Sequence, residues 1–153
     1  FVENGHFACF AGQRFLRLGN SLLTKASLEP RLRELAILRV AQLTDSRYEW
    51  TQHLPIALEA GVRQDQVDSL VYWPRSTAFD GREQAAIAYT DEVTERVRVT
   101  GQTFDRLREH FDDTAIVELT LTIAYWGMVA RLLVALSVDL EEPAGSLRSI
   151  TGR

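Results

Sequence analysis

Glu49 and His53 form the clearest chemical pair in the sequence, because a carboxylate and an imidazole stand four residues apart. Residues with this spacing lie on one face of an α-helix. The carboxylate can fix the tautomer of the imidazole and raise its basicity, and the imidazole can carry a proton near neutral pH. The pair therefore predicts a proton-transfer site. An exposed ion pair on a helix surface has the same spacing, so two residues leave both interpretations open.

Two aromatic residues, Tyr48 and Trp50, flank this pair. Large rings beside a polar pair indicate that the pair is partly enclosed, and they can wall a pocket for a small molecule. Aromatic side chains in a helix also pack in the core without any role in binding. We predict Tyr48 and Trp50 as substrate-binding residues, with core packing as the alternative.

A second carboxylate, Glu34, stands in a segment rich in leucine and isoleucine. A glutamate in such a segment faces water, pairs with an arginine or points into a functional site. Arg31, three residues earlier, lies on the same helix face and offers an ion pair. We predict Glu34 as a second proton-relay group, with the Arg31 ion pair as the alternative. Its distance from Glu49 and His53 depends on how two helices cross.

Arg131 interrupts an apolar segment late in the chain. A guanidinium there can hold a substrate carboxylate through two parallel hydrogen bonds, and a buried or intersubunit ion pair explains it equally well. His6 and His110 are isolated and are expected at the surface. The two glutamates and the histidine described above match no metal-ligand spacing, and the sequence has no phosphate-binding glycine loop or nucleotide fingerprint. We expect neither a metal nor a cofactor.

Helices must position these side chains, since helical periodicity recurs along the chain without a competing strand pattern. Capping residues and glycine or proline stops divide the pattern into six or seven helices joined by short loops, which predicts an all-α bundle. Ser27 and the capping box of Asp80 and Glu83 mark two of the expected starts. The expected helices lie within residues 2–23, 27–43, 47–60, 64–71, 80–97, 103–111 and 112–137.

The domain organisation is simple: one helical domain over residues 1–143, followed by a loose tail over residues 144–153. The last helix is apolar nearly all round, which is typical of a central helix or of one buried against another subunit. Its most apolar stretch, residues 119–130, is shorter than the roughly 20 residues that a membrane span needs, so we expect a buried core helix.

Composition narrows the class of protein. The 153 residues carry a formal net charge of -4, which gives no electrostatic reason to expect a nucleic acid or an anionic membrane as partner. A lone cysteine, Cys9, cannot form an internal disulfide, so we expect a cytoplasmic protein. The sequence begins at Phe1 rather than at a methionine, so we expect that residues preceding it are missing.

Two runs of the sequence resemble a known family. They are similar to the signature of the carboxymuconolactone decarboxylase and alkylhydroperoxidase D-like proteins, and weaker similarity continues through most of the chain. The signature is fairly specific for the family and less so for function within it. The runs are Arg33-Glu34-Leu35-Ala36-Ile37-Leu38-Arg39-Val40-Ala41 and Tyr48-Glu49-Trp50-Thr51-Gln52-His53, followed by residues 57–62.

The resemblance bears on thiol chemistry. The alkylhydroperoxidase D-like members carry Cys-x-x-Cys-x-x-x-His, and setting their histidine on His53 puts the cysteine positions at Ser46 and Glu49. The family's upstream glutamate then falls on Glu34. Peroxide reduction by that route needs a thiolate and a resolving thiol, which serine and glutamate cannot supply. Cys9 lies far off in sequence, so thiol peroxidase activity is disfavoured.

The decarboxylase members carry Glu-x-x-x-His, which Glu49 and His53 match, although the Gly-x-Pro segment of those enzymes is missing here. The resemblance implies a cofactor-free, decarboxylase-type lyase of aromatic compound catabolism, acting on a small carboxylated or lactone substrate. His53 would donate or relay the proton, with Glu49 orienting it or itself donating. It also implies a homo-oligomer, a trimer or hexamer. A different acid–base enzyme, a peroxidase-like redox protein and a non-catalytic oligomeric binding module remain alternatives.

Overall fold

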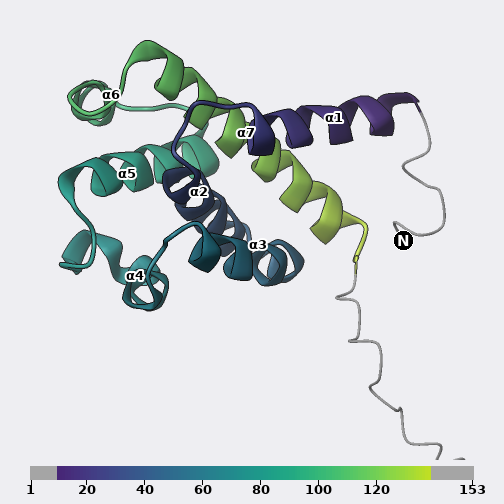
Figure 1. Ribbon diagram of the computed structural model, residues 1–153, viewed down its shortest axis with the longest axis horizontal. Helices are drawn as coiled ribbons and strands as arrows, with labels where there is room; N and C mark the ends of the chain where they lie inside the picture. Colours follow the sequence, from purple (N-terminus) through teal and green to yellow (C-terminus); the bar gives the residue numbers. More distant parts are fainter. Residues whose placement is uncertain (1–9, 139–153) are drawn as a thin grey trace, which may run out of the picture.

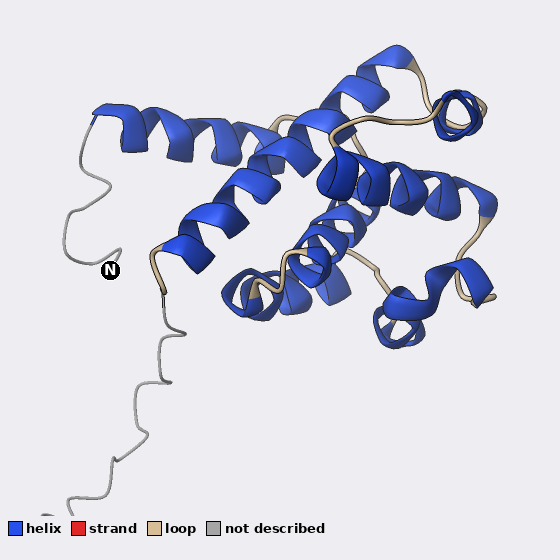
Figure 2. Ribbon diagram, turned by 180° about the vertical axis from the view of Figure 1, so that it is seen from behind, coloured by secondary structure: helices blue, strands red, loops and turns tan. Residues whose placement is uncertain are grey.

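The computed structural model describes residues 10–138, which fold into helices joined by short loops and contain no strand (Figures 1 and 2). This confirms the expected all-α bundle. The start of the first expected helix, His6, Cys9 and the expected tail lie outside the described residues. The helices are α1 (Phe10–Thr24), α2 (Pro30–Leu43), α3 (Arg47–Glu59), α4 (Gln64–Ser69), the 3₁₀ helix η2 (Leu70–Arg75), α5 (Gly81–Arg96), α6 (Gly101–Arg108) and α7 (Asp113–Ala135).

The most enclosed helix is α2, which packs against α3, α5 and α7. Every residue from Leu32 to Ala41 is buried, as expected of a helix covered on all sides. Three of those residues are charged: Arg33, Glu34 and Arg39. Because a buried charge is costly without a partner, the position of α2 obliges neighbouring helices to supply polar partners in the core.

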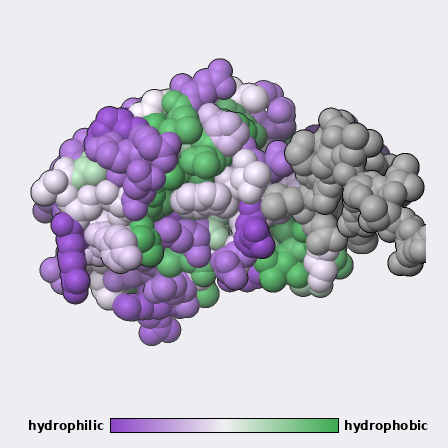
Figure 3. Space-filling model, turned by 90° about the horizontal axis from the view of Figure 1, so that it is seen from below, coloured by the Kyte–Doolittle hydropathy of each residue, from purple (hydrophilic) through white to green (hydrophobic). Residues whose placement is uncertain are grey.

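The long helix α7 runs across the bundle and contacts α1, α2, α5 and α6 (Figure 1). One face is buried, including Leu119, Ile123 and Trp126, whereas Leu121 and Met128 on other faces are exposed. By length and composition alone this helix would also suit a membrane span, but core helices of soluble proteins meet the same criterion. Elsewhere too, apolar side chains reach the surface between polar ones (Figure 3).

One of the two helix starts predicted from capping residues is found in the structure, and the other is not. Asp80 and Glu83 form the expected capping box, with the Glu83 N–H 2.8 Å from Asp80 Oδ1. Ser27 was a wrong prediction for the start of α2, which begins at Pro30 after Glu29. The Ser27 hydroxyl instead donates to Glu118 of α7 at 2.8 Å, and the N–H groups of Ser27 and Leu28 donate to the same carboxylate. Ser27 therefore ties the loop between α1 and α2 to helix α7.

Candidate active site

A continuous hydrogen-bonded chain of side chains links three helices. His53 of α3 lies between Glu34 of α2 and Trp126 of α7. Its Nδ1 is 2.8 Å from Glu34 Oε2, and its Nε2 accepts from the indole N–H of Trp126 at 2.8 Å. The His53 and Trp126 rings meet edge to face, with centroids 5.5 Å apart. Both ring nitrogens of His53 therefore have a partner inside the protein.

Glu34 is fully buried and has a second partner, since the Arg33 guanidinium donates to its Oε1 at 3.3 Å. The alternative pairing of Glu34 with Arg31 is not what the structure shows. Arg31 pairs with Glu29 and Glu83 instead. Glu34 thus has a cation beside it and an imidazole in front of it, which together compensate for the loss of water around a buried carboxylate.

Glu49 makes no hydrogen bond to His53, so the expected contact within this pair is a wrong prediction. The two residues share one helix, but the Nδ1 of His53 is taken by Glu34 from the neighbouring helix. Glu49 is only 2% exposed, and neither of its carboxylate oxygens has a hydrogen-bond partner among the described residues. This helix therefore carries a partnered imidazole and a separate, unpartnered carboxylic acid.

Burial raises the pKa of Glu49 to about 8, because loss of water penalises the charged form. The Ser46 hydroxyl offsets a smaller part of this shift, although the two groups do not meet in a hydrogen bond of ordinary geometry. At neutral pH Glu49 is consequently a neutral carboxylic acid that holds a proton. Strongly shifted acids of this kind are a common feature of active sites.

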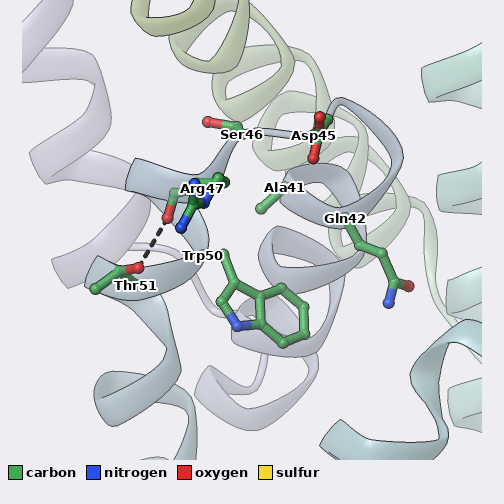
Figure 4. Close-up of a pocket in the computed structure, with 7 residues that line it drawn as sticks. All are labelled: Ala41, Gln42, Asp45, Ser46, Arg47, Trp50 and Thr51. Atoms are coloured by element: carbon green, nitrogen blue, oxygen red, sulfur yellow. Dashed lines mark hydrogen bonds between the residues drawn. The ribbon is translucent and has the colours of Figure 1, made fainter. Parts of the chain in front are cut away.

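A surface pocket of about 370 Å³ opens beside the start of α3 (Figure 4). Ser46 is its connection to Glu49, since Ser46 both borders the pocket and influences the pKa of that acid. Trp50 lines the pocket, as a substrate-binding residue would. Tyr48 is half-buried and is not among the lining residues. The lining residues are Ala41, Gln42, Asp45, Ser46, Arg47, Trp50 and Thr51.

Arg131 lies apart from these groups. Its guanidinium donates to the carbonyl oxygen of Gly127 one turn earlier in α7, at 2.7 Å. It borders a different surface pocket, together with Thr44 and residues of α7. No hydrogen bond or ion pair within residues 10–138 joins Arg131 to Glu34, Glu49 or His53.

Sequence reasoning missed Trp126 as a partner of the histidine. The signal available was that a buried indole N–H requires an acceptor, and Trp126 stands in the apolar core helix. The identity of that acceptor was not readable, because His53 is 73 residues away in the chain. Arg47 and Gln42 were also missed, since each is an ordinary polar residue near a helix end.

The carboxymuconolactone decarboxylase family model matches residues 11–92, which is more than half of the chain and contains Glu34, Glu49 and His53. The chain belongs to the carboxymuconolactone decarboxylase family. Its similarity to an uncharacterised Bacillus subtilis (strain 168) protein, YdfG, is 25% identity over 114 residues, covering 73% of this chain and 78% of the relative.

Solved structures of AhpD-like proteins share the fold of this family member. A protein of unknown function from Agrobacterium tumefaciens, with a provisional assignment as the antioxidant defence protein AhpD, superposes with a TM-score of 0.83 at 22% identity. The match covers 91% of this chain and 97% of that one. The apo debrominase Bmp8 superposes with a TM-score of 0.75 at 18% identity, covering 85% and 70%. At these identities the likeness shows the fold alone.

Proposed function

We propose that this member of the carboxymuconolactone decarboxylase family is a cofactor-free acid–base enzyme, a decarboxylase-type lyase for a small carboxylated or lactone substrate. The observation that carries the proposal is the burial and raised pKa of Glu49. This residue is a buried acid with a pKa of about 8, so it holds a proton at neutral pH, and Ser46, which influences that pKa, borders a pocket. A proton donor whose pKa lies near the working pH is well suited to general acid catalysis.

The reaction balances without a cofactor. In an unsaturated carboxylactone, the bond between the ring and the carboxylate carbon breaks, carbon dioxide leaves, and the electron pair passes to the conjugated ring carbonyl. Glu49 then gives its proton to the ring carbon and is reprotonated from solvent.

The pocket beside Ser46 offers hydrogen-bond donors for a substrate carboxylate. The Arg47 guanidinium forms no ion pair or hydrogen bond with another described residue. The carbonyl oxygen of Gln42 accepts from Arg39 at 2.5 Å, so its amide N–H groups stay available. Asp45 adds a negative charge to the rim, and Trp50 supplies a flat apolar wall. These groups suit a small, planar, singly charged acid better than a dianion.

One solved structure with the same fold contains a small ring compound, although its 18% identity to this chain shows the fold alone. A variant of the debrominase Bmp8 was solved in complex with 2,3,4-tribromopyrrole, and its TM-score to this chain is 0.76.

The substrate roles expected for Tyr48 and Arg131 stay predictions, because neither residue lines the pocket next to Glu49.

The decisive experiment compares wild-type protein with Glu49→Gln in the presence of 4-carboxymuconolactone. Loss of substrate absorbance and release of carbon dioxide are followed together. We expect turnover by the wild type and a decrease of at least about 100-fold in the variant, since the amide has no acidic proton to donate. Glu59→Gln, which changes an exposed glutamate of the same helix, is the matched control and should retain activity. Absence of turnover in the wild type would refute the lyase assignment for this substrate.

Thiol peroxidase activity is the function that this chain should lack. The family's two cysteine positions hold Ser46 and Glu49, and neither side chain can form a sulfenic acid or a disulfide. We expect no hydrogen peroxide consumption with a dithiol reductant present. Consumption above the level of a heat-inactivated sample would contradict this expectation.

We also propose that the protein is cytoplasmic, as expected from its lone cysteine, and that it self-associates, as expected from the family resemblance. Apolar side chains exposed on α1 and α7 support self-association, because contiguous exposed apolar surface commonly marks an interface. A single species of 17.3 kDa in solution scattering at micromolar concentration would contradict it. The side chains are Phe10, Leu16, Leu18, Val117, Leu121, Met128, Leu132 and Val134.

A further inference from the structure

The contacts of His53 determine where its ring protons are. Trp126 can only donate, because an indole nitrogen carries a hydrogen and has no lone pair available for accepting. Its Nε1 lies 2.8 Å from His53 Nε2, so Nε2 must be the acceptor and carry no proton. A neutral imidazole carries one proton, which is then on Nδ1 and points at Glu34 Oε2, 2.8 Å away.

The other protonation states conflict with this geometry. A protonated Glu34 that donated to Nδ1 would leave the ring proton on Nε2, where it would face the indole N–H of Trp126. An imidazolium has protons on both nitrogens and meets the same conflict. Two donors facing each other at hydrogen-bond distance lose the bond and leave a buried donor unsatisfied, which disfavours both of these states. One arrangement satisfies all three residues: ionised Glu34, Nδ1–H on His53, and the Trp126 N–H on Nε2.

We propose that Trp126 is a positioning residue that, together with Glu34, fixes the ring proton of His53 on Nδ1 and leaves Nε2 as an acceptor. Glu34 and Trp126 act on opposite nitrogens of the ring, because the carboxylate accepts from Nδ1 and the indole N–H needs the lone pair of Nε2. The Arg33 guanidinium donates to the other carboxylate oxygen of Glu34 and is the second charged group beside that residue. Trp126 places a donor at Nε2, so this nitrogen serves as the acceptor.

This assignment divides the roles within the candidate site, and that division rests on the proposed function. With both ring nitrogens occupied, His53 has no proton or lone pair directed at a substrate in this conformation. Glu49 is then the proton donor, whereas the Glu34–His53–Trp126 chain of contacts holds α2, α3 and α7 in register around it. His53 would exchange protons with a substrate only after Trp126 moves away from Nε2.

The tautomer is directly measurable without a substrate, by long-range proton–nitrogen correlation NMR at neutral pH. We expect His53 to show a protonated Nδ1 and an unprotonated Nε2, the reverse of the tautomer that an unconstrained neutral histidine favours. The exposed His110 provides an internal reference. A wild-type spectrum in which Nε2 of His53 is protonated would overturn the proposal, whatever the outcome of the lyase assay.

A variant isolates the part played by Trp126. Trp126→Phe keeps an aromatic ring in the core but removes the N–H, and we expect the nitrogen resonance of His53 Nε2 to shift because that atom loses its hydrogen-bond donor. Trp73→Phe is the matched control, because the Trp73 N–H donates to Asp91 and does not contact His53. An unchanged His53 spectrum in folded Trp126→Phe would overturn the role of Trp126. If that variant fails to fold, the wild-type spectrum still tests the tautomer.

Discussion

Glu83 and Glu49 are equally buried, each with 2% of its surface exposed, yet their surroundings are opposite. The Glu83 carboxylate accepts from the backbone N–H of Asp80 at 2.9 Å, from the Gln66 amide at 2.8 Å and from Arg31. Glu49 has no hydrogen-bond partner among the described residues. Burial therefore does not by itself separate these two carboxylates, whereas their hydrogen-bond partners do.

The difference has a physical consequence for the charge of each residue. A carboxylate surrounded by donors is stabilised as an anion, and it ties its partners together. A carboxylate enclosed without donors is more stable as the neutral acid, and it keeps its proton until a base takes it. Glu83 thus joins α4 and α5 to the start of α2, while Glu49 stores a proton near a pocket.

The largest expected effect is the pH dependence of stability that Glu49 produces. Its pKa is about 8 in the folded state against 4.5 for an ordinary glutamate. Between these values the unfolded chain releases the proton while the folded chain keeps it, so stability falls as pH rises, by at most about 1.4 kcal/mol per pH unit. Below this window both states are protonated, and above it both are ionised, so the contribution stays constant.

Urea unfolding of wild type and Glu49→Gln at a series of pH values across this window measures the effect. An amide does not titrate, so the variant should lose the slope and gain stability over the wild type as pH rises. Other groups that titrate are common to both proteins and cancel in the difference. Parallel stability curves for the two proteins would show that Glu49 is already ionised in the folded state.

The second largest expected effect is the loss of stability when Glu83, the carboxylate with hydrogen-bond partners, is replaced. Glu83→Ala removes the acceptor for Arg31, Gln66 and the Asp80 N–H, and should lower the free energy of unfolding by about 3 kcal/mol. This value is the lower end of the stability loss found when one partner of a buried ion pair is removed. It applies here because the Arg31 side chain is 25% exposed and keeps Glu29 as a partner. The measurement is the urea midpoint at unchanged m-value.

Glu95→Ala is the matched control for this substitution, since Glu95 is an exposed glutamate of the same helix. Its effect should stay within about 0.5 kcal/mol. Similar losses for the two variants would mean that the contacts of Glu83 contribute little, and the contrast with Glu49 would then carry no information about function.

The sequence predicted the helices better than the contacts between them. Helical periodicity and the Asp80–Glu83 capping box are local patterns, and both are found in the structure. The pairing of His53 was assigned to Glu49 because residues four apart are the only neighbours that a single helix reveals. The actual partners, Glu34 and Trp126, come from two other helices. Their proximity depends on how α2, α3 and α7 cross, and no local spacing contains that information.

The pKa of Glu49 shows the same limit in energetic terms. The sequence marks the residue as a candidate through its spacing and the family pattern, but its burial depends on the packing of residues distant in the chain. Ser46 is likewise an ordinary N-cap residue by sequence. In the structure it precedes α3 without a capping hydrogen bond, and its buried hydroxyl has no partner among the described residues.

Ser46→Ala should have the smallest effect on stability and sharpens the contrast most directly. Substitution of a capping serine typically costs about 1 kcal/mol. Here the hydroxyl caps nothing, so the free energy of unfolding should change by less than about 0.5 kcal/mol, with a gain if relief of the buried hydroxyl dominates. Because Ser46 lowers the pKa of Glu49 in part, its removal should move the upper edge of the pH window higher. The same urea series across pH measures both effects, and a loss above about 1 kcal/mol would show that the hydroxyl has a partner in solution.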